Sequence, residues 1–305
     1  MLSIIVPARN SPEFTGRCIG SILFSLSRLQ IPAEFILIDD ASAPQEQILD
    51  VFRRHRAQAQ GPFEWKIVRS KKNQHYSGVF SIGLNLATRD IILFISNDMM
   101  VTPTFLQALL IVSALSPEIG IVRGTSNHTD SHPEHQVEPP EPMKDYKDIV
   151  EFSRQQFAAN GARFVEDPVL SGDAIVLKRA LVDRIGMLDL RFFGYFGDID
   201  YGMRAHLAGF KLVCAKGAWL HHEGEGHVKR EMEMAAGEID ERRRARMELV
   251  EAAYQQFRRK WSMEKPERYR DMGAVDYFAH ARQHAREIEL KYIMPQSVMD
   301  DVEYY

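Results

Sequence analysis

The sequence predicts an α/β fold in which a mostly parallel sheet is flanked by helices and followed by a C-terminal helical extension. Two observations support this prediction. Over the first 125 residues, short aliphatic runs alternate with longer amphipathic segments, a pattern typical of βαβ units. Near the end of the chain, apolar residues recur at steps of three and four, which indicates a helix with one apolar face.

The expected elements of the first part follow one another as strand, helix, strand. Strands are expected at 4–7, 35–38, 65–68, 91–95 and 119–123, and helices at 15–29, 46–56, 79–87 and 103–115. The helices join strands that run in the same direction, so the sheet should be mostly parallel, with helices on both faces.

Residues 126–168 differ from the part before them because they are rich in proline, histidine and acids. We expect a long loop that carries one helix over 146–159. The loop also holds His128, His132 and His135. Pro133 would break any helical face that could align these rings, so we expect solvated histidines rather than a metal site.

A second ordered block is expected over 169–219, and a charged helical tail from about residue 228. The apolar stripe of that tail consists of Met247, Val250, Tyr254, Phe257 and Trp261. Pro266 should end this helix, and a second helix is expected over 275–292. The stripe is expected to pack on the main domain, with a homodimer seam as the alternative.

Composition excludes several classes of protein. The 305 residues are 45% hydrophobic and 26% charged, which suits either one large core or a core with an appendage. The net charge is −4, so no overall basic field points to nucleic acid. Only two cysteines, Cys18 and Cys214, suggest a reducing, cytoplasmic compartment. No basic leader precedes the first strand, and the densest apolar run, 105–115, falls short of the about 20 residues that span a bilayer, so at most peripheral membrane contact is expected.

Acids stand where apolar segments end. Asp98 comes three residues after the buried strand expected at 91–95, and Asp198 and Asp200 follow another apolar stretch. In open α/β sheets, ligands bind at the carboxyl ends of the strands. Asp98 is therefore a candidate for a ligand site, and the alternative is a turn or helix cap, the more common place of a lone acid after a strand.

An ordered series of short blocks resembles the inverting family 2 glycosyltransferases with the GT-A fold, of the kind that build bacterial surface polysaccharides. The blocks, which extend over residues 2–227, are SIIVPARN (3–10), FILIDDAS (35–42), SND (96–98), LSGDA (170–174), GDIDY (197–201) and AWLHHEG (218–224). The resemblance implies a Rossmann-like sheet. It also implies a nucleotide-sugar-binding half over 1–125, an acceptor-side half over 126–227, and a separate extension over 228–305.

The resemblance implies a donor site in the first half. The residues expected to bind the nucleotide sugar are Pro7, Ala8, Arg9, Asn10, Asp39, Asp40, Asn73, Gly78, Asn85, Ser96, Asn97 and Asp98. Asp39 or Asp40 would accept hydrogen bonds from the base or ribose, while at least one of the two could instead form the turn before Ala41.

A divalent cation, Mn²⁺ or Mg²⁺, is implied at Asp98, because it neutralises the charge that grows on a diphosphate leaving group. His221 is the first candidate for a second ligand. His222 is the other candidate, since the register is uncertain by one residue. The chain differs from the family's Asp-X-Asp motif in having Ser96 at the first position.

The resemblance assigns the general base to Asp198, with Asp173 and then Asp189 as the alternatives. Gly197 stands where the family has a glutamate. Gly172, Asp173, Asp200 and Arg204 are expected on the acceptor side, and Asp200 and Arg204 are spaced for an ion pair.

The function implied is inverting transfer of a sugar from a UDP- or dTDP-linked donor to a hydroxyl of a glycan or lipid-linked glycan. The alternative is a scaffold without catalytic activity that binds a nucleotide sugar or glycan. A nucleotidylyltransferase is excluded, because the loop over 7–12 lacks the glycines of a phosphate-binding loop.

Overall fold

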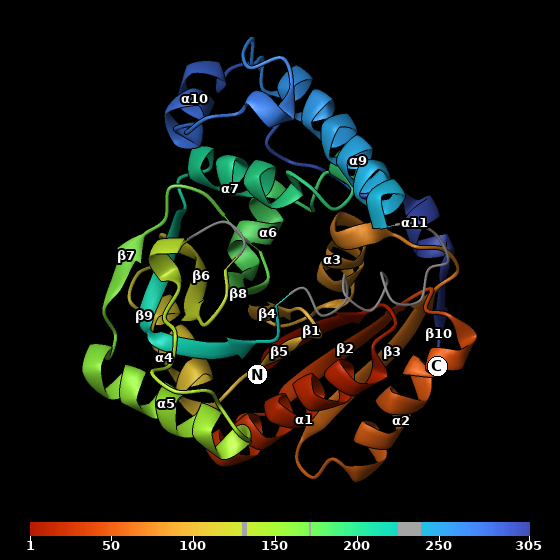
Figure 1. The fold of residues 1–305 in the computed structure, drawn as a ribbon, viewed down its shortest axis with the longest axis vertical. Helices are drawn as coiled ribbons and strands as arrows, with labels where there is room; N and C mark the ends of the chain where they lie inside the picture. The colour runs from red at the N-terminus through yellow and green to blue at the C-terminus, as the bar shows by residue number, and fades with distance from the viewer. Residues whose placement is uncertain (130–132, 171, 225–238) are drawn as a thin grey trace.

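The computed structural model describes residues 1–129, 133–170, 172–224 and 239–305 (Figure 1). A twisted sheet runs through the molecule in the strand order β10-β3-β2-β1-β4-β8-β6-β9-β5, and β7 pairs with β9. Four neighbouring strands are parallel: β1 (Leu2–Ala8), β2 (Ala33–Asp40), β3 (Phe63–Ser70) and β4 (Ile91–Ile95). Their carboxyl ends therefore meet along one edge of the sheet.

The sheet is of mixed direction beyond β4. Strand β8 (Ala174–Lys178) lies antiparallel between β4 and β6 (Ile119–Ser126), and β9 (Lys211–His222) is parallel to β6. The short strands β5 (Met99–Met100) and β7 (Phe164–Glu166) pair antiparallel with β9. Strand β10 (Val302–Tyr304) adds the C-terminus to β3. The expected α/β fold with a central sheet flanked by helices is thus confirmed. The sheet is parallel over β1 to β4, as expected, and mixed beyond them.

Helices cover both faces of the sheet. One face carries α1 (Pro12–Leu29), α2 (Ile48–Gln58) and α4 (Pro103–Ala114), and α5 (Tyr146–Asn160) packs on α4 and β9. The other face carries α3 (His75–Leu86), α6 (Arg179–Ile185), α7 (Gly197–Leu207) and the short α11 (Gln296–Asp300).

The central strands are apolar on both faces. In β1, Ile4 contributes to one core layer and Ile5 to the other, and in β4 Leu93 and Phe94 divide in the same way. Strands buried on both sides read as unbroken hydrophobic runs, which is why the sequence shows no alternation there. Because the core holds these strands, the polar residues after their ends lie at a well-defined edge.

The C-terminal residues pack against α7. In α9 (Ile239–Lys260), Val250, Tyr254 and Phe257 are buried with Trp261 against Phe192, Phe196 and Met203 of the same chain. Figure 1 shows α9 and α10 beside α7. Met247 does not belong to this buried face, because it is 47% exposed. The predicted domain boundary at 227/228 lies outside the described residues.

Two sequence expectations for loops and helices are wrong. The helix expected over 275–292 is only α10 (Tyr277–His284), because Tyr292 instead exchanges backbone hydrogen bonds with Ile185 and Met187. His135 is not solvated. It is 2% exposed and pairs with buried Asp167, because the short helix Pro133–His135 folds the loop back onto the sheet.

The other two loop histidines differ from each other. His128 packs edge-on against His222, with ring centroids 5.2 Å apart, and His132 lies outside the described residues. In the described parts of the chain, no helix combines the length and apolarity needed to cross a bilayer.

Candidate active site

The loops at the carboxyl edge of the sheet are held in unusual backbone conformations. Several residues other than glycine have positive φ there: Asn10, Ser11, Ala41, His75, Phe193 and Phe196. Such conformations cost free energy and tend to gather at functional sites, where the surrounding structure holds them in place. We therefore expect the functional site at this edge of the sheet.

The loops after β1 and β2 are locked together. The Arg9 guanidinium donates to the carbonyl of Asp40 over 2.9 Å. Asn10 accepts a hydrogen bond from the backbone of Ala43 at 2.9 Å, and its own backbone N–H donates to the Ser42 hydroxyl at 2.8 Å. Strand β1 ends on Pro7 and Ala8 just before these contacts. The first predicted donor block thus forms one rigid corner.

Asp39 and Asp40 have different surroundings. Asp39 is fully buried, accepts from the backbone N–H of Ser42 at 2.9 Å and pairs with Arg69. It therefore forms the turn. Burial raises the pKa of Asp40 to about 7, although its carboxylate accepts from the backbone of Gln74 at 2.7 Å. Asp40 is left as the candidate for contact with a base or ribose.

The loop and helix after β3 hold three predicted donor residues. Asn73 caps the turn that leads into α3 by accepting from the backbone of His75 at 2.9 Å. Gly78 has no room for a side chain, since a Cβ would lie 2.7 Å from Gln74 Cβ. Asn85 is misassigned. It is exposed in the last turn of α3, at the end that leads to the start of β4, so it lies at the opposite edge of the sheet.

Asp98 is held by contacts of its neighbours. Ser96 donates its backbone N–H to the carbonyl of Asp173 at 2.8 Å, which ties the two acidic loops together. Asn97 donates to the Thr15 hydroxyl at 2.9 Å. The carbonyl of Asp98 accepts from the backbone of Glu223 at 3.0 Å, and its side chain is only 3% exposed. The predicted metal ligand therefore faces the end of β9.

The strand register favours His222 over His221 as the partner of Asp98. Strand β5 pairs Met99 with His222. Because side chains alternate along a strand, His221 points to the opposite face of β9. His222 Nε2 lies 3.5 Å from Asp98 Oδ2. His221 Nδ1, in contrast, is buried without a hydrogen-bond partner among the described residues, and burial lowers its pKa.

The ring of His222 is oriented by a second set of contacts. Its Nδ1 lies 3.2 Å from the carbonyl of His128. The Asn127 side-chain amide donates to the backbone carbonyl of His222 and accepts from its backbone N–H. Burial alone would lower the pKa of His222, but the nearby Asp98 carboxylate, with Asp173, raises it to about 9. A carbonyl at Nδ1 leaves Nε2 directed toward Asp98.

The chemistry of Asp98 and His222 fits a small divalent cation. A carboxylate oxygen and an imidazole nitrogen are ligands that suit Mn²⁺ well and Mg²⁺ in part. Within the described ranges, no three His, Cys, Asp or Glu side chains gather closely enough to form a complete site. Two protein ligands would leave the remaining positions for phosphate oxygens and water.

Asp198 lies in the first turn of α7, next to the loop before β8. A Cβ at Gly172 would approach Asp198 Cβ within 3.5 Å and would clash with the Tyr76 hydroxyl, so only glycine fits there. Tyr76 donates to the carbonyl of Gly172 at 3.0 Å. Burial raises the pKa of Asp198 to about 6, and the charge of Asp173 adds to the increase. A carboxylate with this pKa suits a general base.

The structure explains why glycine stands at 197. A Cβ at Gly197 would clash with the Ser77 hydroxyl, because α7 begins directly against the first turn of α3. Ser77 also donates its backbone N–H to the carbonyl of Phe193 at 2.8 Å. The family's glutamate does not fit here, and close helix packing positions the neighbouring Asp198 instead.

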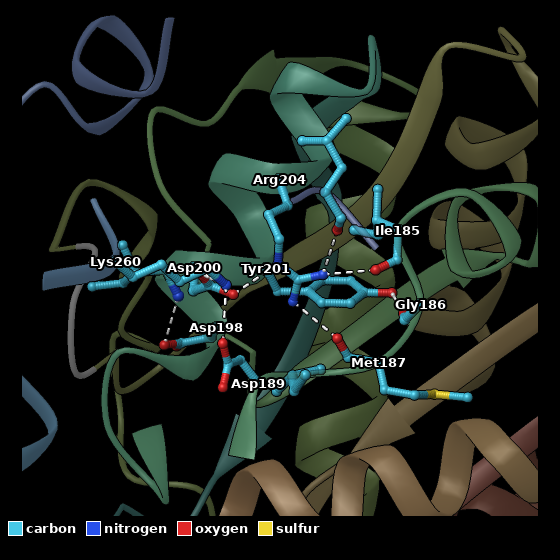
Figure 2. Close-up of polar contacts among 12 residues, drawn as sticks. Ile185, Gly186, Met187, Asp189, Asp198, Asp200, Tyr201, Arg204 and Lys260 are labelled. Atoms are coloured by element: carbon cyan, nitrogen blue, oxygen red, sulfur yellow. Dashed lines mark hydrogen bonds and ion pairs between the residues drawn. The ribbon is translucent and has the colours of Figure 1, made fainter. Parts of the chain in front are cut away.

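Asp200 and Arg204 are both fully buried, and they pair with each other in α7, the helix that also carries Asp198 (Figure 2). Arg204 Nε donates to Asp200 at 2.8 Å, and the rest of its guanidinium donates to the carbonyls of Ile185 and Met187. Neither side chain is exposed, so direct contact with an acceptor does not agree with this structure. The ion pair expected from their spacing is present.

The sequence analysis assigned no role to Lys260, which joins two buried acids in the structure. Its ammonium lies 2.6 Å from Asp200 Oδ1 and 3.1 Å from Asp189 Oδ2, and Trp261 Nε1 donates to Asp200 at 3.0 Å. The end of α9 is thereby tied to the helix that carries Asp198. The sequence indicated this contact only through the position of the lysine, directly before Trp261 at the end of the apolar stripe.

The activity should depend on the ionisation of Asp198. A protonated carboxyl cannot accept a proton, so kcat/KM should fall about tenfold per pH unit below about pH 6 and level off above it. Initial rates between pH 4.5 and 8 would test this dependence. A flat profile between pH 5 and 7 would contradict the assignment. In Asp198→Asn, the residual activity should no longer fall below about pH 6.

Comparison with known proteins identifies relatives of the chain. The sequence profile of glycosyl transferase family 2 matches residues 3–186, more than half of the chain. The chain is 24% identical over 247 residues to the O-antigen biosynthesis protein RfbC of Myxococcus xanthus, covering 73% of this chain and 17% of RfbC. It is 35% identical over 66 residues, or 21% of this chain, to the uncharacterized protein Rv1525 of Mycobacterium tuberculosis, of which it covers 25%. The chain thus spans a quarter or less of these relatives.

Two solved structures share the fold. The mannosyltransferase PcManGT from Pyrobaculum calidifontis, in complex with GDP-Man and Mn²⁺, has a TM-score of 0.53 at 14% identity, covering 93% of this chain and 79% of that chain. Residues 1–349 of TarS from S. aureus give 0.52 at 13% identity, covering 87% and 75%. At these identities the likeness shows the arrangement of the chain alone.

Proposed function

The chain is a glycosyltransferase, since it belongs to glycosyl transferase family 2 and has the GT-A fold, and on this premise we propose that it transfers a sugar with inversion from a nucleoside-diphosphate donor to a glycan hydroxyl. The observation that carries the proposal is the convergence at one edge of the sheet of Asp98 with His222 and of Asp198 with Asp173. The relative named for O-antigen biosynthesis supports a glycan or lipid-linked glycan as the acceptor.

We assign the nucleotide to the corner formed by Arg9, Asn10 and Asp40, and a divalent cation to Asp98 and His222. The Mn²⁺ and GDP-Man of the mannosyltransferase PcManGT and the UDP bound to TarS support a nucleotide and a divalent cation as the ligands. When bound, the cation would neutralise the charge on the leaving diphosphate. Asp98 and His222 would hold it, and Asn97 and Asn127 would keep their backbones in place.

Asp198 would act on the acceptor. Inversion requires the acceptor oxygen to attack the anomeric carbon from the face opposite the diphosphate, while the bond to the diphosphate oxygen breaks. The Asp198 carboxylate would take the hydroxyl proton in the same step. Its raised pKa makes it a stronger base than an exposed aspartate, and close contact of α7 with α3 fixes its position.

Asp98→Ala should abolish Mn²⁺-dependent nucleotide binding without unfolding the protein, because it removes a carboxylate ligand whose backbone contacts remain. Calorimetric titrations of UDP, GDP and dTDP, each with and without Mn²⁺, would measure the effect. Asp183→Ala, which removes an exposed acid on α6, is the matched control. Unchanged nucleotide affinity of Asp98→Ala in Mn²⁺ would contradict the metal assignment.

The same titrations, with an activity assay, separate the proposed enzyme from a scaffold that only binds nucleotide sugars. Tight binding of a sugar nucleotide that is neither hydrolysed nor transferred to any glycan acceptor would favour the scaffold. Release of the nucleoside diphosphate that depends on Asp198 would favour the enzyme.

A further inference from the structure

Arg123 is a buried cation that the proposed function does not use. It lies in the middle of β6, opposite Ile175 of β8 and Cys214 of β9, and is 8% exposed. Its Nη1 has no hydrogen-bond partner among the described residues. In the described part of the chain, no carboxylate forms an ion pair with it. This is unusual, because a buried guanidinium is costly unless a counter-ion compensates it.

Arg123 lines a cavity next to the proposed transfer site. The cavity is also lined by Asp173, His222, Thr125, Ser126 and Thr129. His222 is the proposed partner of Asp98, and Asp173 is close enough to Asp198 to raise its pKa. The cavity therefore borders the places assigned to the metal and to the base, where the two sugars of the reaction would meet.

The lining indicates the chemistry of a ligand. Hydroxyl, imidazole and carboxylate groups are suited to hydrogen bonds with sugar hydroxyls. The guanidinium needs an anion, and its planar fork matches a carboxylate. A phosphate dianion would be repelled more strongly by Asp173 in the same cavity than a singly charged carboxylate.

We propose that Arg123 binds the carboxylate of a hexuronic acid, either on the donor or on the acceptor sugar. The inference rests on the proposed function, because it places a substrate sugar in the cavity lined by His222 and Asp173. It makes Arg123 a specificity-determining residue that selects a sugar with a carboxylate at C6 over one with a hydroxymethyl group.

The stability of Arg123→Met is the first test. If the counter-ion of Arg123 is a ligand anion, the free protein holds a buried charge without a counter-ion, and Arg123→Met removes that charge. The midpoint of urea unfolding should then be equal to or higher than that of the wild type. If Arg123 instead stabilises the fold through contacts within the chain, the midpoint should fall clearly. A clear fall would overturn the proposal unless Arg123→Lys, which keeps the charge, shows the binding pattern described below.

Binding is the second test, and it uses sugars that differ only at C6. The donor arm compares UDP-glucuronate with UDP-glucose and GDP-mannuronate with GDP-mannose in Mn²⁺. The acceptor arm compares methyl β-D-glucuronide with methyl β-D-glucoside, with and without nucleotide. The wild type should prefer the acidic member of one pair by about tenfold to a hundredfold, the contribution of one charge-assisted pair.

The two arms distinguish the source of the carboxylate. Arg123→Met should lose the preference, and Arg123→Lys should keep part of it. Preference in the donor arm assigns a hexuronate donor, and preference in the acceptor arm assigns a hexuronate acceptor. Equal binding of the acidic and neutral members in every pair overturns the inference. If UDP and GDP both fail to bind, the proposed donor site fails, while the glucuronide measured without nucleotide still decides on Arg123.

Discussion

Asp198→Asn is expected to lower turnover by about two to four orders of magnitude, the usual contribution of positioned proton transfer. Asparagine keeps the shape of the side chain and can still accept the hydrogen bond that the backbone N–H of Ile199 donates to Asp198 at 2.9 Å. It cannot take a proton from the acceptor hydroxyl. Nucleotide affinity should stay near the wild-type value, because the proposed donor contacts at Asp40 and Asp98 lie elsewhere. Single-turnover rates and calorimetry would measure the two effects separately.

Asp183→Asn is the matched control for this experiment, since it makes the same change at an exposed position and should leave turnover unchanged. More than about a tenth of wild-type turnover in Asp198→Asn, above the range for a general base, would move the assignment to Asp173. Asp189, the second alternative from the sequence, does not suit the role. It is fully buried and paired with Arg191 and Lys260, which hold its pKa at about 2 despite the opposing effect of burial.

Lys260→Met should lower the free energy of unfolding by about 3–5 kcal/mol, the effect of removing one partner from a buried ion pair. The Lys260 side chain is 9% exposed and lies between the Asp189 and Asp200 carboxylates (Figure 2). Methionine has a similar length and an apolar stem, so the change is mainly the loss of the ammonium, which also lies 5.5 Å from the centre of the Phe192 ring. Urea unfolding followed by circular dichroism would give the difference.

Arg259→Met tests whether the effect depends on burial. Arg259 is the exposed neighbour in the same helix, so its replacement should change stability by less than about 0.5 kcal/mol. Equal unfolding midpoints for Lys260→Met and Arg259→Met would show that Arg191 and Arg204 neutralise the two acids without help. Loss of stability should be accompanied by loss of turnover, because Asp200 stands two residues from Asp198 in α7.

Local sequence patterns predicted most of the elements. The nine strands and helices expected between residues 4 and 123 all occur, with changes at their ends. The short strands β5, β7 and β10 were not foreseen. Strands of two or three residues carry no periodicity, and they exist because β9 and β3 offer open edges to pair with.

Longer-range contacts decided the details of the candidate site. His135 was expected to be solvated because it stands in a proline-rich segment. Its partner Asp167 lies 32 residues away, so no local pattern indicates the contact. Asn85 looked like a site residue because it follows the expected motif. Its place is set by the length of α3, which carries it to the far edge of the sheet.

The sequence by itself determined that acids would stand at the carboxyl ends of buried strands, because chain direction in βαβ units places every strand end on the same edge. Only the tertiary structure decided which side chains meet there. Strand pairing turned His222 rather than His221 toward Asp98, and close helix contact left room for nothing larger than glycine beside Asp198. The physical reason is that periodicity is a local property of the chain, whereas register and packing depend on residues that are far apart in sequence.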